Sequence, residues 1–412
     1  MGEGLNYHGL AALMTRTYRG EDLTELGQTL IQRSAHPSAE GAPEATLDLA
    51  VLLHLKGFHD MAREVQMQGL RQRQIYRLPA ARGPALRLLA LMVPGELNAN
   101  TPLEFLVEDS DIELQQLFIA ADLPFPEEIL EHDVAMVAVG ECENVLKLLA
   151  ALEPALVHWP RPVLNQPAQI ARLSRDVISD DAQGLEGVVW PRTVRMGRVD
   201  LECLARQEVA LEHWLGPAAA FPVIVRPLDS HAGKGLQRID DPDQWSAYLS
   251  VQPEADFFVS PFIDYRSGDG RFRKYRIALI EGAAFASHMA ISDHWMIHYL
   301  NGGMEGDAEK RQEEAAFMSN FETGFAHRQS KALERIYSFL GLDYVILDCA
   351  EMPDGRLLVF EADSSAVVHA MDSIDLFPYK RPAMDKIFKA FRQMLLRAKD
   401  QPPGLIRLSR VS

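Results

Sequence analysis

The chain has 412 residues, of which 47% are hydrophobic, and its 58 acidic and 41 basic side chains give a formal net charge of −17. This length predicts two or three domains of ordinary globular composition. Because so acidic a surface repels phosphate backbones and anionic lipid, and no basic run offsets it, we expect binding to neither nucleic acid nor membranes. No stretch approaches the roughly 20 apolar residues of a membrane span.

The cysteines and the N-terminus indicate a compartment. Cys142, Cys203 and Cys349 have spacings that suit neither a disulfide framework nor a zinc site, so they indicate incidental thiols in a reducing environment. The N-terminus lacks the basic start and apolar stretch of a signal peptide. We therefore expect a cytoplasmic protein.

Residues 1–82 are predicted to form a helical, tetratricopeptide-like cap. Apolar residues recur at helical spacing on both sides of Gly57, which indicates a helix–turn–helix unit. A single unit of this kind cannot bury its own apolar face. We therefore expect it to pack against the following domain.

Residues 83–180 are predicted to form a doubly wound α/β domain. Short apolar runs at 85–94, 112–119 and 134–141 indicate buried strands, and residues 143–152 have the spacing of an amphipathic helix. Strands that alternate with helices favour a parallel sheet.

Residues 181–400 follow a different pattern, that of an α+β domain with antiparallel sheets. Strand-like runs are separated by hairpin signals such as Glu281-Gly282 and Asp354-Gly355, and helical segments flank them. The fold class is thus a multidomain combination of α/β and α+β.

The segment VIVRPLDSHAGKGL, residues 223–236, is the first candidate site. Glycines allow backbone N–H groups to converge on phosphate oxygens, and flanking cations add positive charge. The residues concerned are Arg226, Ser230, His231, Gly233, Lys234 and Gly235. The segment is not a Walker loop, and taken alone it is equally compatible with a plain hairpin turn.

The segment YVILDCAEMPDGRLLVFEAD supplies the second candidate site. Glu361 and Asp363 are two positions apart in one strand and so share a face, and Asp348 on the preceding strand can lie across from them. Converging carboxylates between apolar strands favour a bound cation, and oxygen ligands suit Mg²⁺ or Mn²⁺. The alternative is that these acids face solvent at a sheet edge.

The order of these features resembles that of the ATP-grasp superfamily. A strand with Arg226-Pro227 and a glycine loop is followed by the apolar stretch FFVSPFID, the basic strand RKYR, Asp348, and Glu361-Ala362-Asp363. The resemblance extends over residues 83–395. It is greatest to ligases that add amino acids to a carboxylate, such as ribosomal-protein glutamate ligases and glutathione synthetases.

The resemblance implies a role for each matching position. Arg226 would touch the α- and β-phosphates of ATP, and residues 230–235 would close over the β- and γ-phosphates. Residues 258–263, including Ser260 and Phe262, would hold adenine, and Asp264 would hold ribose. Arg276, with Lys274 on the same strand, would meet the γ-phosphate and the acyl phosphate, and Asp348, Glu361 and Asp363 would bind the metal.

The chain also departs from the family pattern. Val177 stands where the family has a lysine, so Arg175 or Arg172 must supply that charge. Arg226 replaces a lysine and keeps the charge, and Asp363 replaces an asparagine and keeps the ligand oxygen.

Three histidines follow the basic strand. His294 and His298 have the spacing of metal ligands on a helix, but no H-E-x-x-H pattern accompanies them. On a strand and loop, they and His288 would instead line the cleft beside Arg276, where His298 would contact substrate. Packed or solvent-facing histidines are an equal alternative.

The sequence thus predicts an ATP- and magnesium-dependent ligase that activates a small-molecule or peptide carboxylate and joins it to an amine. No nucleophilic triad is evident, and phosphoryl transfer needs none. A small-molecule kinase and an ATP-binding scaffold remain the alternatives. A homodimer is compatible with the sequence.

Overall fold

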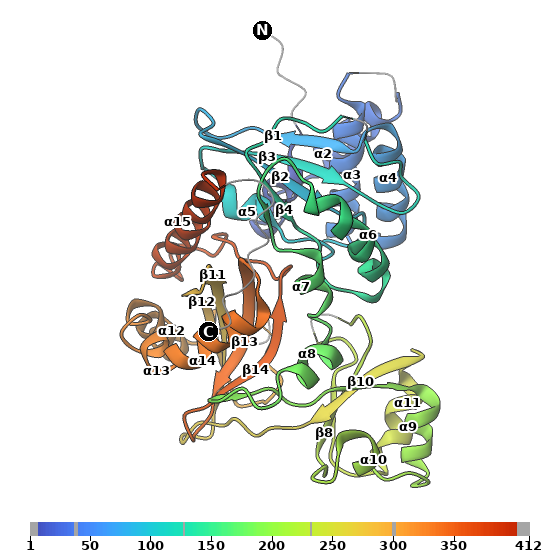
Figure 1. Cartoon of the computed structure of the whole chain (residues 1–412), viewed down its shortest axis with the longest axis vertical. Coiled ribbons are helices and arrows are strands. Elements are labelled where there is room, and N and C mark those ends of the chain that lie inside the picture. Colours follow the sequence, from blue (N-terminus) through green and yellow to red (C-terminus); the bar gives the residue numbers. More distant parts are fainter. Residues whose placement is uncertain (1–6, 37–39, 127, 231–232, 299–301, 402–412) are drawn as a thin grey trace. The chain divides into compact units, whose positions relative to one another are not determined.

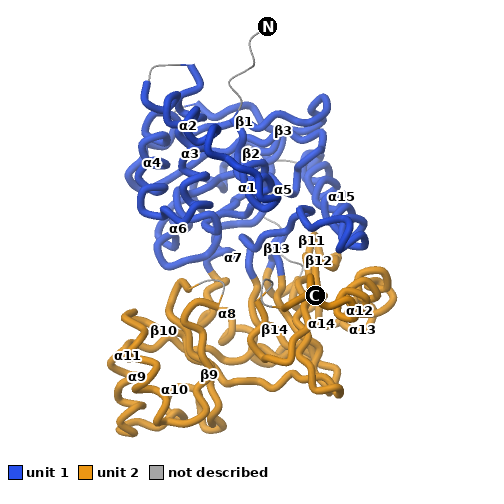
Figure 2. The backbone as a smooth tube through the Cα atoms, turned by 180° about the vertical axis from the view of Figure 1, so that it is seen from behind, with its two compact units in different colours: residues 1–171, 341–346, 363–412 blue, residues 172–340, 347–362 orange. Residues whose placement is uncertain are grey.

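The computed structural model describes residues 7–36, 40–126, 128–230, 233–298 and 302–401. Two compact units divide the chain (Figures 1 and 2). Unit 1 contains residues 1–171, 341–346 and 363–412, and unit 2 contains residues 172–340 and 347–362. The predicted helical cap and residues 83–171 of the predicted α/β domain therefore lie in one unit, whereas residues 172–180 lie in the other.

Unit 1 begins with helices. They are α1 (Gly9–Tyr18), α2 (Thr24–Ser34), α3 (Ala42–Leu55) and α4 (His59–Gln72). Gly57, with a φ of +84°, makes the tight turn between α3 and α4, as the sequence predicted for this helix pair. Leu47 of α3 and Leu70 of α4 pack with Tyr76 and Phe118, so these helices share a core with the sheet.

The sheet of unit 1 has the strand order β1-β3-β2-β4-β5. Its strands are β1 (Ile75–Leu78), β2 (Leu86–Met92), β3 (Ile112–Phe118), β4 (Val134–Val137) and β5 (Val163–Leu164). β2 pairs in parallel with β3 and β4, and β4 with β5, as predicted. The prediction that residues up to 82 are helical was wrong for β1, which pairs antiparallel with β3.

Helices complete unit 1. They are α5 (Leu103–Val107), α6 (Leu146–Val157), which follows the 3-10 turn η1 (Glu143–Val145), α7 (Pro167–Ala171) and α15 (Lys380–Lys399). α15 contacts α5, β2 and β4. The sequence prediction placed residues 380–399 with the preceding α+β domain, whereas the helix packs in unit 1.

Unit 2 contains a first antiparallel sheet of order β7-β10-β8-β9. Its strands are β7 (Val194–Gly197), β8 (Val223–Pro227), β9 (Gln237–Ile239) and β10 (Asp256–Pro261), and its helices are α9 (Arg198–Ala205), α10 (Glu212–Leu215) and α11 (Gln244–Val251). Trp245 of α11 and Phe257 of β10 are fully buried in the shared core.

A second sheet has the order β12-β11-β13-β14-β6. Its strands are β6 (Val188–Val189), β11 (Phe272–Ile280), β12 (Ala283–Ser292), β13 (Tyr344–Glu351) and β14 (Leu357–Asp363). Glu281 and Gly282 both have positive φ and make the predicted hairpin turn between β11 and β12. The neighbouring helices are α8 (Arg175–Asp181), α12 (Ala308–Ser319), α13 (Phe325–Arg328) and α14 (Ser330–Leu340).

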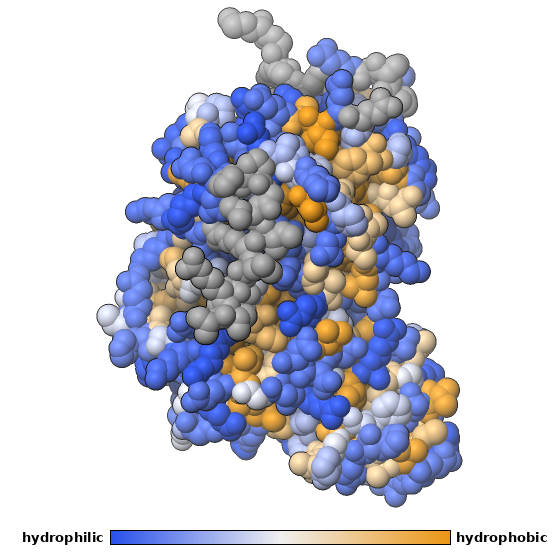
Figure 3. Space-filling view, viewed as in Figure 1, coloured by the Kyte–Doolittle hydropathy of each residue, from blue (hydrophilic) through white to orange (hydrophobic). Residues whose placement is uncertain are grey.

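The structure agrees with the predicted mixture of α/β and α+β folds. On the face seen in Figure 3, hydrophilic residues predominate and hydrophobic residues form separate patches among them. Among the described residues, no helix combines the length and the apolar character needed to cross a bilayer.

Candidate active site

Asp348 lies on β13 and is held by two cations from the adjacent strand. Arg276 donates from Nε to Oδ1 at 2.7 Å and from Nη2 to Oδ2 at 2.9 Å, and Lys274 Nζ lies 2.7 Å from Oδ2. Lys274 and Arg276 share a face because they are two positions apart on β11. The sequence prediction named these three residues, and the structure brings them together.

The charge of Asp348 depends on these partners. The aspartate is 5% exposed, and burial alone would raise its pKa. The positive charges of Arg276 and Lys274 outweigh burial and hold the pKa well below its usual range. Asp348 is therefore an anion at neutral pH.

Glu361 on β14 has its own cationic partner, Arg175 of α8. Arg175 forms an ion pair with the Glu361 carboxylate and donates from Nη1 to the Phe360 carbonyl at 3.2 Å. Burial raises the pKa of Glu361 and the charge of Asp348 adds to this effect, but the positive charges of Arg175, Arg226 and Lys274 together leave the pKa below its usual value. Arg172, the alternative candidate for the missing lysine charge, instead pairs with Asp181.

Arg226 connects this cluster to the glycine loop. Its Nε donates to Ser230 Oγ at 3.2 Å, and its Nη2 donates to the Ser230 carbonyl. Burial, and then the positive charge of Arg175, lower the pKa of Arg226 to about 10, which leaves it charged at neutral pH. Two positive charges this close together make a site that favours an added anion.

The glycine loop has a conformation that other residues would not adopt easily. Gly233 and Gly235 have φ values of +75° and +66°. A Cβ atom on Gly235 would lie 2.7 Å from two ring carbons of Pro227. Lys234 between them is exposed, and His231 lies outside the described residues.

The predicted adenine segment, residues 258–263, is only partly available. Phe258 and Val259 of β10 pair with β7 on one side and with β8 on the other, so their backbone groups already take part in the sheet. Ser260 pairs with Ile224 of β8, and the described pairing of β10 with β7 ends before it. The Phe262 N–H donates to the Pro222 carbonyl at 3.0 Å. Asp264 forms an ion pair with Arg266, whose side chain lowers the Asp264 pKa.

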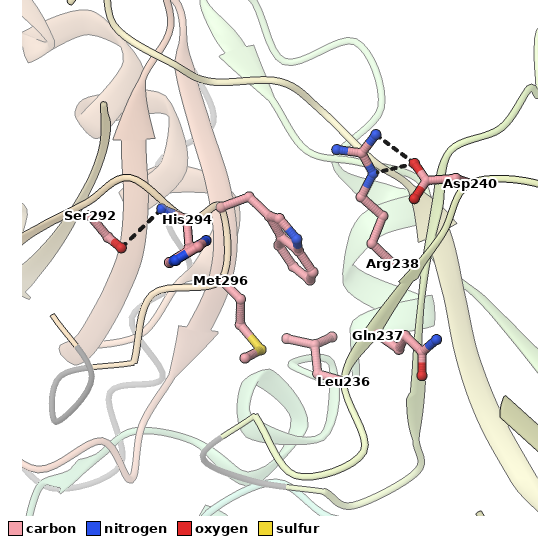
Figure 4. Close-up of a pocket in the computed structure, with 8 residues that line it drawn as sticks. Leu236, Gln237, Arg238, Asp240, Ser292, His294 and Met296 are labelled. Atoms are coloured by element: carbon pink, nitrogen blue, oxygen red, sulfur yellow. Dashed lines mark hydrogen bonds and ion pairs between the residues drawn. The ribbon is translucent and has the colours of Figure 1, made fainter. Parts of the chain in front are cut away.

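A pocket of about 650 Å³ opens beside this segment, within unit 2. Its lining residues come from β9 with the residue on either side of it, and from the end of β12 onward: Leu236, Gln237, Arg238, Asp240, Ser292, His294, Trp295 and Met296. Figure 4 shows Leu236 and Met296 facing each other and Arg238 paired with Asp240. The Phe262 ring stands edge-on to Trp295 at 5.8 Å, and the Arg238 guanidinium lies over Phe262 at 4.3 Å.

The histidines lie on a strand and a loop rather than on a helix. His288 is opposite Arg276 in the β11–β12 register, and His294 and His298 follow β12. Of the two arrangements considered for His294 and His298, a helical pair and a strand with a loop, the structure therefore has the second. Burial, then Lys274 and Arg276, lower the pKa of His298, so this imidazole is neutral and lies within electrostatic range of the cations.

The donor set fits magnesium in its chemistry. Asp348 and Glu361 offer only oxygen, which Mg²⁺ prefers, and their charges are close enough that Asp348 raises the Glu361 pKa. Mg²⁺ takes few protein ligands and completes its shell with water and phosphate oxygens. Asp363 belongs to unit 1, and its carboxylate accepts from Ser365 N at 2.6 Å and Ser365 Oγ at 2.7 Å, so its role as a ligand stays a prediction.

No family model and no curated protein sequence matches the chain. Solved structures do match. VanG D-Ala:D-Ser ligase from Enterococcus faecalis is 11% identical with a TM-score of 0.45, covering 76% of this chain and 100% of that one. D-alanyl-alanine synthetase A from Vibrio cholerae is 11% identical with a TM-score of 0.47, covering 76% and 98%. A RimK domain protein ATP-grasp from Sphaerobacter thermophilus is 16% identical with a TM-score of 0.41, covering 75% and 99%.

Similarity at these identities and TM-scores says nothing about the reaction, so the functional proposal rests on the residues of the cluster. Sequence reasoning missed part of the site, namely Arg238 and the pocket beside it. Arg238 follows the glycine loop by three residues, and no local pattern indicates that it covers Phe262. Trp295 belongs to the segment that contains His294 and His298, and no local pattern indicates that it lines a pocket.

Proposed function

We propose that this chain is an ATP- and magnesium-dependent ligase that activates a carboxylate as an acyl phosphate and joins it to an amine. The observation that carries the proposal is the cluster in unit 2, in which four cations surround two carboxylates. The cations are Arg175, Arg226, Lys274 and Arg276, and the carboxylates are Asp348 and Glu361.

The charge balance of this cluster favours a polyphosphate. Four positive charges against two negative ones leave an excess of positive charge, in a chain whose formal net charge is −17. Such a local reversal raises the concentration of anions at the site. Arginine forks also match the geometry of phosphate oxygens.

The pocket beside Trp295 suits the base of the nucleotide. Its lining combines the aromatic Trp295 and the apolar Leu236 and Met296 with the polar side chains of Gln237, Arg238, Asp240, Ser292 and His294. Small-molecule sites typically combine aromatic and apolar walls with polar groups that fix the orientation of the ligand. Leu236 follows directly on the glycine loop, so a base in this pocket would have its phosphates near the loop.

The chain's residues divide the work of phosphoryl transfer. Bound Mg²⁺, held by Asp348 and Glu361, would neutralise phosphate charge. Arg276 and Lys274 orient the γ-phosphate for attack by the substrate carboxylate, which yields ADP and an acyl phosphate. The glycine loop excludes water that would hydrolyse this intermediate. His298, neutral and beside the cations, accepts the proton that the amine loses as it displaces phosphate.

The proposed substrates are small-molecule or peptide carboxylates and amines. Dependence on ATP agrees with a cytoplasmic location. The test is a screen for magnesium-dependent ADP release over amino acids and dipeptides, with hydroxylamine present in a parallel set. A ligase releases ADP with its carboxylate and gives a hydroxamate in the parallel set.

Two variants calibrate this screen. Asp348→Asn removes the anion between Arg276 and Lys274 and is expected to abolish ADP release. Asp354→Asn changes an exposed aspartate in the β13–β14 turn. The described interactions of its side chain are all with Arg356, so this variant is expected to retain activity. ADP release without hydroxamate would indicate a kinase instead, and ATP binding without release with any carboxylate would refute catalysis.

A further inference from the structure

A cluster of two histidines and a glutamate lies in unit 1, apart in sequence from the residues of the proposed ligase site. His54 is near the end of α3, His59 is the first residue of α4, and Glu96 follows β2. One ligand atom from each lies within 4.8 Å of the others, and this is the only such group among the residues that the structure describes. We propose that His54, His59 and Glu96 bind a divalent transition-metal ion such as Zn²⁺ or Co²⁺.

Two of the three distances between ligand atoms suit tetrahedral coordination. Glu96 Oε2 lies 3.3 Å from His54 Nδ1 and 3.0 Å from His59 Nδ1. Ligands bound at about 2.0–2.1 Å around a tetrahedral metal are roughly 3.3 Å apart. A metal therefore needs little movement of Glu96 relative to either ring.

The buried histidine supplies an independent reason for a ligand. The His54 side chain is 2% exposed, and among the described atoms its ring makes only the 3.3 Å contact of Nδ1 with Glu96 Oε2, while Nε2 has no hydrogen-bond partner. A buried polar group without a hydrogen-bond partner destabilises the folded state. Coordination of Nδ1 to a metal removes part of this cost, and the ring borders a cavity of about 50 Å³ that has room for a water to accept the Nε2 proton.

The local structure holds these side chains in place. The turn at Gly57, with a φ of +84°, brings the end of α3 and the start of α4 together, so the two histidines meet although they are five positions apart. The Gly95 N–H donates to Gln66 Oε1 of α4 at 2.9 Å, which fixes the loop that carries Glu96. Arg63 lies 3.6 Å from Glu96 Oε1 and so leaves Oε2 to the histidines.

The donor set indicates which metals fit. Imidazole and carboxylate ligands suit zinc and its neighbours in the first transition row, whereas magnesium prefers oxygen alone. His59 and Glu96 are 58% and 38% exposed, so the remaining coordination position faces water, as in sites that keep an open position.

The test uses the full-length protein with Co²⁺ in excess Mg²⁺, so that oxygen-only sites are occupied. We expect one equivalent of Co²⁺ with the intense visible absorption of four- or five-coordinate cobalt, displaced by Zn²⁺. His59→Ala and Glu96→Gln, which change exposed side chains, should each weaken binding by at least about tenfold.

The matched control is His158→Ala, which removes an exposed histidine elsewhere in unit 1 and should leave cobalt binding unchanged. Circular dichroism of every variant checks that the fold is retained. Absence of the cobalt band, or a band of the same intensity and affinity in both His59→Ala and Glu96→Gln, would overturn the proposal. Since none of these residues belongs to the ATP cluster, failure here leaves the ligase proposal standing.

Discussion

Two arginines on β11 provide a matched pair for separating catalysis from stability. Arg276 binds both oxygens of Asp348, whereas Arg273 binds Asp269 and Glu313. Their side chains are similarly buried, with exposures of 22% and 16%. Each forms paired hydrogen bonds that only the guanidinium fork can make.

Arg276→Lys should lower kcat/KM by about 100-fold, because a hydrogen-bond donor directed at a transferring phosphoryl group is worth about that much, and lysine keeps the charge but loses the directed donors of the fork. Arg273→Lys should leave kcat/KM within about threefold, because its partners lie outside the cluster. ADP-release kinetics of both variants measure the difference. Equal losses of kcat/KM in the two variants would show that both substitutions disturb the structure of β11, and that Arg276 makes no particular contact with phosphate.

Trp295 provides a residue-scale test of the pocket. Trp295→Ala removes the aromatic wall and should raise KM for ATP about tenfold, with kcat changed less, because stacking contacts form equally in the ground and transition states. Trp295→Phe keeps a ring opposite Phe262 and should recover most of the affinity. An unchanged KM in Trp295→Ala would place the base elsewhere.

At the scale of elements, the glycine loop depends on one backbone position. Gly235→Ala places a Cβ atom 2.7 Å from Pro227 carbons and also requires a positive φ, so the turn must open. We expect a melting temperature several degrees lower and a KM for ATP raised about tenfold or more.

Gly270→Ala is the control that introduces an unfavourable positive φ without a steric clash. Gly270 also has a positive φ, +83°, but a Cβ atom there meets nothing within 4 Å. It should cost only the roughly 1–2 kcal/mol of the left-handed conformation and should not affect KM. If both variants raise KM equally, the contact with Pro227 is not what shapes the loop.

Elements whose signals are local could be predicted from the sequence. The hairpins of β11 with β12 and of β13 with β14 have turn residues between two strand-like runs. These turns predicted the strands, and the strands in turn predicted where Lys274, Arg276 and Asp348 lie. β1 could not be predicted, because IYRL is a strand only through pairing with β3, about forty residues away. Likewise, the sequence could not show that Arg175 rather than Arg172 pairs with Glu361, because this depends on where α8 packs.

At the scale of the whole molecule, sequence order and packing differ. The chain leaves unit 1 after residue 171, returns for 341–346, leaves again for 347–362 and returns at 363. The C-terminal helix α15 therefore supplies core residues such as Ile387, Phe391 and Leu395 to the unit that contains the N-terminal helices. Domain membership of this kind depends on contacts distant in sequence, which local patterns do not contain.

Unit 1 also contains two buried acids that hold its first helix. Asp48 of α3 accepts hydrogen bonds from the backbone N–H groups of His8 and Gly9, both at 2.9 Å. Glu104 of α5 accepts from Ala11 N at 2.7 Å and from Gln116 Nε2 at 2.8 Å. Burial raises the pKa of both carboxyls, that of Asp48 to about 7.

The stability of this region should therefore depend on pH. The folded pKa of Asp48 is above its unfolded value of 3.8, so the folded state binds more protons between about pH 4 and pH 7. The stabilisation is complete below the unfolded pKa and is lost as pH rises through 7, at up to about 1.4 kcal/mol per pH unit.

Because two units need not unfold together, amide hydrogen exchange in α1 is the suitable measurement. The opening free energy of α1 should fall between pH 5 and pH 7 in the wild type. Asp48→Asn cannot titrate and should reduce that fall, whereas Asp122→Asn, which changes an aspartate 62% exposed, should not. An equal fall in Asp48→Asn would assign the pH dependence to other groups, with Glu104→Gln the next variant to compare.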